Sequence, residues 1–85
     1  MKKSPSNEGF PQPTKRELKT LTRCIGNWEE CSDLQQAILL IVIRGTQQPR
    51  WIAPKLGVSR EDVVNSLDGI AGILVDANTK TIYFQ

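Results

Sequence analysis

The chain has 85 residues, of which 39% are hydrophobic, and a formal net charge of +2. This length predicts one domain with a small core. The longest apolar run, residues 37–43, is far shorter than the ~20 residues that span a bilayer. Lys2 and Lys3 are followed by no apolar segment, so the start of the sequence does not indicate a secretory signal. We therefore expect a cytoplasmic protein that does not contact membranes.

Histidine is absent from the sequence, and the cysteines are Cys24 and Cys31. Histidine is the commonest general base in enzymes, and two thiols do not complete a tetrahedral zinc site. The sequence also shows no nucleophile–base pair and no glycine-rich phosphate loop. We expect neither an enzyme nor a cofactor, metal or small-molecule substrate. We expect both thiols to be reduced, as in most cytosolic proteins.

Residues 1–13 contain three prolines, a glycine and many polar residues, a composition that predicts a disordered arm. Thr14 and Glu17 form a capping-box pattern, which predicts a helix start, and we expect this helix to end near Asn27. Its apolar stripe consists of Leu18, Leu21, Ile25 and Trp28. Its opposite stripe consists of Lys15, Arg16, Lys19 and Arg23. Residues 14–31 therefore predict an amphipathic N-terminal helix whose basic face is either simply solvated or a binding surface.

A second capping box, Ser32 to Gln35, predicts another helix start. Residues 37–43 behind it are apolar on every side, which indicates burial from more than one direction. A buried strand is the competing prediction, but the length and the caps favour a helix. Three of these side chains point away from the core formed with the helices that follow and need another element to cover them, namely Leu39, Leu40 and Ile43. Either the N-terminal helix or a second copy of the chain can supply that cover.

Residues 51–70 predict two short helices around a sharp turn. Gly57 supplies the positive φ that such a turn needs, and Ser59 offers its hydroxyl as the cap of the second helix. Helical spacing turns three residues of that second helix inward, namely Val63, Leu67 and Ile70. We expect Trp51, at the start of the first helix, to pack on the segment that follows the motif. The pattern is that of a helix-turn-helix.

Two β-prone runs, residues 73–76 and 80–84, flank the short polar segment 77–79 and predict a hairpin. A long helix, an extended link at residues 46–49, a helix-turn-helix and a hairpin, in that order, resemble a winged helix-turn-helix. The pattern Ile-Ala-x-x-Leu-Gly-Val-Ser of residues 52–59 is similar to that of small bacterial winged-helix transcription regulators. In size the chain is similar to those regulators of this class that control fimbrial operons. The segment from Ile70 to Gly72 is two residues shorter than the corresponding segment of these regulators, so the second motif helix should end early.

The resemblance covers residues 32–85 and implies a mainly α fold with a β-hairpin, to which the N-terminal helix is an addition. The implied function is DNA binding in transcription regulation, with double-stranded DNA as partner. Carried over onto this sequence, the contacts are Ser59, Arg60 and Asn65 on the second motif helix and Lys80 in the wing. The same face also carries Glu61, Asp62 and Asp68, which are unfavourable near phosphates.

Charge is distributed unevenly along the chain. Residues 1–23 hold six basic and two acidic residues, whereas residues 24–85 hold five basic and seven acidic residues. We therefore expect DNA binding to rely on the basic arm and the N-terminal helix. The additional contacts predicted there are Lys2, Lys3, Lys15, Arg16, Lys19 and Arg23.

Two alternatives remain open at this stage. The first is a small helical bundle without a wing. The second is a protein-binding winged helix that uses either its acidic helix face, at Glu61, Asp62 and Asp68, or the apolar surface at Leu39, Leu40 and Ile43. If that apolar surface is exposed in one chain, it also predicts a homodimer, which would pair two DNA half-sites.

Overall fold

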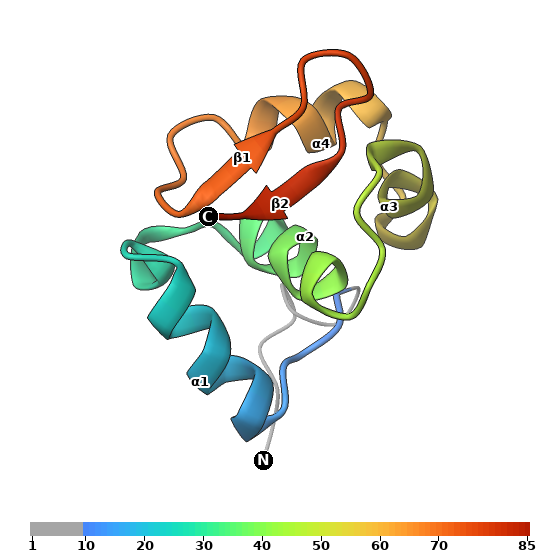
Figure 1. Cartoon of the computed structure of the whole chain (residues 1–85). Helices are drawn as coiled ribbons and strands as arrows, with labels where there is room; N and C mark the ends of the chain where they lie inside the picture. Colours follow the sequence, from blue (N-terminus) through green and yellow to red (C-terminus); the bar gives the residue numbers. More distant parts are fainter. Residues whose placement is uncertain (1–9) are drawn as a thin grey trace.

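A computed structural model describes residues 10–85 of the chain. This part of the molecule is mainly helical, with a small two-stranded antiparallel hairpin (Figure 1). The elements are α1 (Lys15–Cys24), the 3₁₀ helix η2 (Trp28–Glu30), α2 (Asp33–Ile43), α3 (Pro49–Leu56), α4 (Arg60–Ser66), β1 (Ile73–Val75) and β2 (Ile82–Phe84). Residues 37–43 are thus helical, and the alternative of a bundle without a hairpin is wrong. None of the helices in residues 10–85 has the length and apolarity needed to cross a membrane.

Both predicted capping boxes are present. The Thr14 hydroxyl accepts from the Glu17 backbone N–H at 3.2 Å, and the Glu17 carboxylate accepts from the Thr14 N–H at 2.9 Å. Ser32 and Gln35 make the same reciprocal pair, at 3.2 and 2.7 Å. These bonds satisfy backbone donors that a helix start otherwise leaves unpaired. Local sequence alone therefore sets where α1 and α2 begin.

The apolar surface of α2 is covered from within the same chain. Helix α1 packs against α2, and the two leucines expected to need a cover, Leu39 and Leu40, are 0% and 1% exposed. Leu21 and Ile25, on the apolar side of α1 and at its end, belong to the same core. Ile43 is half-buried against that core. The prediction that Leu39 and Leu40 present a surface to a partner protein or a second copy is therefore wrong.

Helix α1 ends at Cys24, earlier than the expected Asn27, because Ile25 takes an extended backbone conformation. The chain then turns, and the short helix η2 places Trp28 in the core. The Asn27 side chain crosses to the loop after α4, where it donates to the Gly69 carbonyl at 3.4 Å and accepts from the Ala71 N–H at 3.2 Å. The N-terminal segment is thus bonded to the loop between α4 and β1.

An ion pair joins the start of α1 to the end of α2. Arg44 donates through Nε to one Glu17 carboxylate oxygen at 2.8 Å and through Nη2 to the other at 3.0 Å. These hydrogen bonds from Arg44, together with the backbone N–H of Thr14, lower the pKa of Glu17 to about 2. Glu17 therefore serves both the cap of α1 and its attachment to α2.

The hairpin is short and is attached to the link before α3. Its strands pair Ile73 with Phe84, Leu74 with Tyr83 and Val75 with Ile82. The Ile82 N–H donates to the Gln47 carbonyl at 2.9 Å, and the Gln47 side-chain amide donates to the Ile82 carbonyl at 3.0 Å. Ile82 itself is fully buried. The outer edge of β2 is therefore covered by the extended link.

Trp51 does not pack on the hairpin as expected, since its side chain is 59% exposed. Helix α3 buries Ile52, Ala53 and Leu56 against the core. A helix turns by about 100° per residue, so the side chain before Ile52 points away from that buried face. The two cysteines are free, with Cys24 at the end of α1 and Cys31 just after η2.

Candidate nucleic-acid interface

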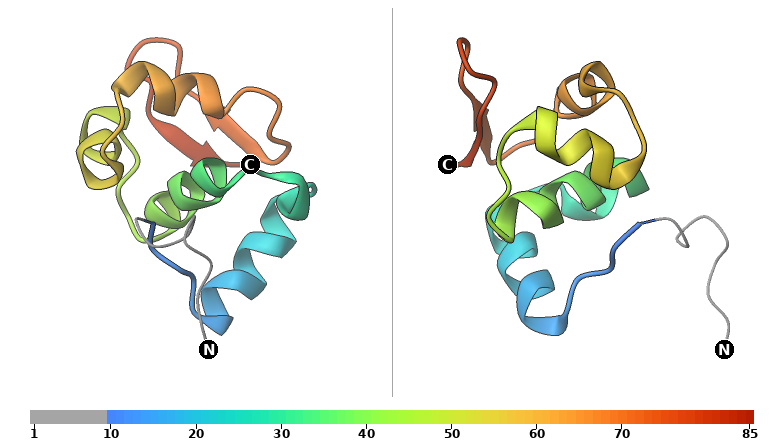
Figure 2. Two further views of the ribbon diagram at one scale, coloured as in Figure 1. Left: turned by 180° about the vertical axis from the view of Figure 1, so that it is seen from behind. Right: turned by 90° about the vertical axis from the view of Figure 1, so that its right-hand side faces the viewer.

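A groove of about 700 Å³ lies where three separate segments meet: the start of α3, the exposed side of α4 and the turn of the hairpin. Most of its lining residues are of polar or charged types. The lining residues are Gln48, Pro49, Arg50, Arg60, Glu61, Val64, Asn65, Asn78, Thr79 and Lys80. The three segments gather at the end of the molecule opposite α1 (Figures 1 and 2).

The turn between α3 and α4 aims the exposed side of α4 into the groove. Gly57 ends α3 with φ +71°, a conformation that is costly for a residue with a Cβ. Ser59 then caps α4, its hydroxyl accepting from the Asp62 N–H at 3.0 Å. Val63 is fully buried, so α4 is fixed with Arg60 and Asn65 on its exposed side. Helix α4 ends at Ser66, early as expected.

The hairpin turn is held by its own first residue. One carboxylate oxygen of Asp76 accepts from the Asn78 N–H at 2.7 Å and from the Thr79 N–H at 3.0 Å. The backbone N–H of Thr79, followed by that of Asn78, lowers the pKa of Asp76 by hydrogen bonding to its carboxylate. Lys80 follows with φ +63° and donates its N–H back to the Asp76 carbonyl at 2.9 Å. The turn therefore presents Asn78, Thr79 and Lys80 in a defined arrangement rather than as a loose loop.

Basic side chains outnumber acidic ones in the groove. Each of the three segments contributes one cation: Arg50 from α3, Arg60 from α4 and Lys80 from the hairpin turn. Glu61 is the carboxylate in the lining, so the formal charge of the groove is +2. Arg50 is oriented by a hydrogen bond from its Nε to the Gln48 side-chain oxygen at 3.1 Å. All three cations are exposed to solvent.

The structure brings together Arg60, Asn65 and Lys80, which the sequence predicted as DNA contacts, and it makes Ser59 their positioning cap. Of the three predicted acids, Glu61 lines the groove, while Asp62 and Asp68 are exposed outside its lining. Sequence reasoning missed Arg50 as a site residue. Its place directly after Pro49, at the start of the first motif helix, was the available signal.

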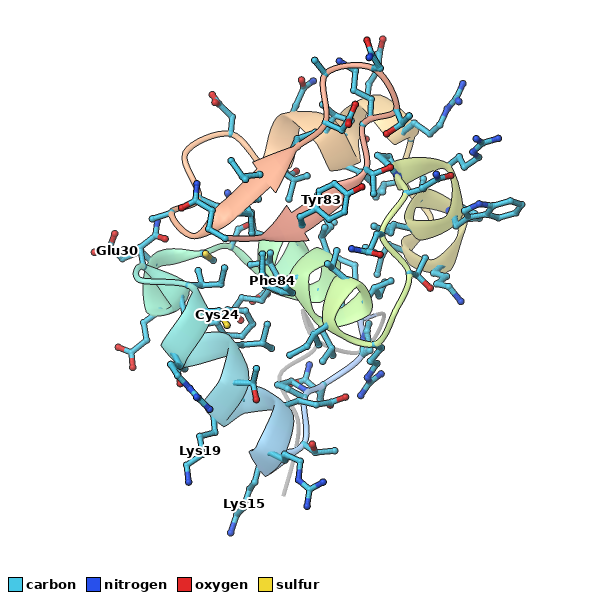
Figure 3. All side chains as sticks on the ribbon, viewed as in Figure 1. Lys15, Lys19, Cys24, Glu30, Tyr83 and Phe84 are labelled. Carbon is cyan, nitrogen blue, oxygen red and sulfur yellow. The ribbon has the colours of Figure 1, made fainter. Side chains whose placement is uncertain are left out.

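The basic stripe of α1 does not reach the groove. Lys15, Arg16, Lys19 and Arg23 are exposed on a helix at the opposite end of the molecule (Figures 1 and 3). The basic stripe and the groove are therefore separate surfaces, and the contribution of this helix to DNA binding stays a prediction. Lys2 and Lys3, and most of the predicted arm, lie outside the described residues.

The groove offers guanidinium and ammonium groups together with side-chain amides. Such groups bind phosphates and base edges. Residues 10–85 contain no cluster of His, Cys, Asp and Glu side chains that could hold a metal ion. Comparisons with protein families, curated proteins and solved structures found no match for this chain.

Proposed function

We propose that the chain is a winged helix-turn-helix protein that binds double-stranded DNA through this groove and regulates transcription. The order of elements supports this fold: a helix, an extended link that hydrogen-bonds to β2, two helices around Gly57, and a hairpin. In this assignment α4 is the recognition helix and the hairpin is the wing. A helix presented in this way fits the major groove of B-DNA.

The observation that carries the proposal is the convergence of Arg50, Arg60 and Lys80 on one groove. They are separated in sequence, and each comes from a different element. Neutralising phosphates supplies most of the non-specific affinity of proteins for DNA. Arg50 and Lys80 come from the elements on either side of the recognition helix and are arranged to neutralise phosphates, while Arg60 lies on that helix itself.

Each groove residue then has a distinct task. Arg50 and Lys80, at the two margins, contact backbone phosphates, while Arg60 and Asn65 on α4 reach base edges. An asparagine amide matches the paired donor and acceptor of adenine, and an arginine matches guanine. Glu61 can accept from a cytosine amino group, a contact that would offset its repulsion of phosphates.

The test is a fluorescence-anisotropy titration of labelled genomic duplex fragments with wild type and with the variant Arg50→Gln/Arg60→Gln/Lys80→Gln. Each phosphate contact contributes about 0.9 to the slope of log affinity against log salt, so loss of the two phosphate contacts of Arg50 and Lys80 should make the variant slope shallower by about 1.8. From about 50 to about 200 mM salt, wild type should lose roughly 12-fold more affinity than the variant.

The control variant, Lys15→Gln/Lys19→Gln/Arg23→Gln, removes three cations from the opposite end of the molecule. At sub-micromolar protein it should bind a single duplex within about threefold of wild type, because non-specific sites bind only at roughly micromolar or higher concentrations. Equal salt slopes for wild type and the groove variant would overturn the proposal.

A second candidate function is the binding of a basic protein partner through α4. Asp62 and Asp68, which are exposed outside the groove, favour it, and so does the exposed Trp51, since tryptophan is enriched at protein interfaces. Failure of wild type to bind any duplex at low salt would favour this candidate over DNA binding.

A further inference from the structure

The basic residues of α1 form one continuous face. At about 100° per residue, Lys15, Arg16, Lys19 and Arg23 fall within an arc of about 100°. The arc extends for about 12 Å along the helix axis, because each residue advances the helix by about 1.5 Å. All four side chains are exposed. Lys15 and Lys19 project from the end of the molecule, away from the core (Figure 3).

Acidic residues nearby leave the charge of this face in place. Glu17, the acid within α1, is paired with Arg44 of α2 and points away from the arc. Glu29 and Glu30 lie beyond the C-terminal end of α1, on η2 (Figure 3). In residues 10–85, the ion pair within 4.0 Å is that of Glu17 with Arg44, so the four arc cations have no paired carboxylate. The arc therefore presents a formal charge of +4.

The other side of α1 limits which partner the arc can take. A basic amphipathic helix often binds a membrane surface by inserting its apolar side between lipids. In α1 that side holds Leu18, which is 39% exposed, together with Leu21 and the capping residue Ile25, which are 0% and 1% exposed within the protein core. Membrane insertion would therefore require α1 to leave the fold.

The composition of the arc favours phosphates over a protein surface. Besides the four cations, the exposed residues of α1 are Leu18 and Thr22, and none of them is aromatic. Cores of protein interfaces are enriched in aromatic residues and depleted in lysine. A duplex carries about one phosphate charge per 1.7 Å of its axis on its two strands together, so the length that matches an arc of 12 Å holds roughly seven charges.

We propose that the basic face of α1 binds a second duplex segment, so that one molecule bridges two stretches of DNA. This inference rests on the proposed function, because the first stretch is held in the groove. The two surfaces lie at opposite ends of the molecule in every view (Figures 1 and 2). One straight duplex cannot contact both. Binding at the α1 face is non-specific, since phosphate contacts carry no sequence information.

A two-duplex capture assay tests the bridge. A short duplex chosen for tight groove binding is immobilised and saturated with protein, and a fluorescent duplex of unrelated sequence is then added at low salt. Wild type should retain the fluorescent duplex. The variant Lys15→Gln/Arg16→Gln/Lys19→Gln/Arg23→Gln should remain on the immobilised duplex and retain at least about tenfold less of the second, because four phosphate contacts are lost. Glutamine keeps a good helix propensity, so α1 should persist in the variant.

The outcomes separate this inference from the proposed function. If the α1 variant captures the second duplex as well as wild type does, the bridge does not use α1, and the inference is wrong. If wild type holds the first duplex but captures no second, the inference fails while the proposed function stands. If wild type does not bind the immobilised duplex, the proposed function fails, and the bridge fails with it.

Sedimentation of the wild-type protein provides the control for dimerisation. A dimer would bridge two duplexes through its two grooves, and capture by the α1 variant would then remain intact. Binding of the arc to phosphatidylserine vesicles but not to DNA would also overturn the inference.

Discussion

Replacing Leu21 with alanine should destabilise the whole protein, because α1 is part of its single core. Leu21 is 0% exposed. Removing a fully buried leucine side chain costs about 2.7–5 kcal/mol, depending on how far the cavity collapses. A chain of this length has a free energy of unfolding of roughly 4–13 kcal/mol. We expect a loss of about 3 kcal/mol, which leaves the variant folded at room temperature but lowers Tm by roughly 12–24 °C.

Urea and thermal unfolding followed by circular dichroism measure this loss. The matched control is Leu18→Ala, which makes the same change on the same helix where the side chain is 39% exposed. We expect that control to lose less than about 1 kcal/mol, since little apolar area is removed from the interior. Both variants should unfold in one transition with an unchanged dependence on urea.

Two results would refute this reasoning. If Leu21→Ala stays within about 0.5 kcal/mol of wild type, α1 does not pack on α2 as the structure has it. A separate early transition that involves only part of the helical signal would mean that α1 unfolds independently of the remaining helices.

Three further changes have defined outcomes. Glu17→Gln should reduce the loss of stability on acidification. The pKa of Glu17 in the folded protein is about 2, below its ordinary value near 4.5, so the stabilising ion pair is complete above pH 4.5 and is lost as the pH falls towards 2. Thermal melts across this pH range would contradict this expectation if the variant and wild type lost the same stability. Leu40→Asp should prevent folding rather than convert a dimer into a monomer, because it buries an unpaired charge at a site that is 1% exposed. A circular dichroism spectrum of a folded variant would contradict this expectation. Gly72→Ala should lower the free energy of unfolding by at least about 2 kcal/mol, since Gly72 has φ +106° and a Cβ there would overlap a backbone carbonyl of α1. The control Gly26→Ala, where a Cβ meets open space, should leave the free energy of unfolding nearly unchanged in the same denaturant titration.

Local signals predicted most of the helix boundaries. The capping residues Thr14, Ser32 and Ser59 lie within three residues of their partners, and Gly57 marks a turn through its own backbone conformation. Such information resides in neighbouring residues, so it can be read without knowing the fold. Trp51 is the local exception: the tendency of tryptophan to be buried was the wrong guide, because Pro49, Ile52, Ala53 and Leu56 form the buried face of α3 and Trp51 lies on the other side of the helix.

Long-range pairings could not be predicted in the same way. The cap role of Glu17 follows from the sequence, but its ion pair with Arg44 joins residues 27 apart. The hydrogen bonds of Asn27 to the loop after α4 span 42 and 44 residues. Arg50 enters the groove only because α3, α4 and the hairpin turn are packed together. Whether the apolar surface of α2 is covered by α1 or by a second copy likewise depends on tertiary packing.

The most direct test of DNA binding through the groove is amide chemical-shift mapping by NMR, with an unlabelled duplex titrated into isotope-labelled full-length protein. If the groove binds DNA, the first and largest shifts should fall on Arg50, Arg60, Asn65 and the hairpin turn at residues 78–80, and shifts on α1 should appear only with excess duplex. Early shifts confined to α1, or to the exposed hairpin residues Leu74 and Tyr83, would contradict the assignment of the groove as the DNA-binding surface.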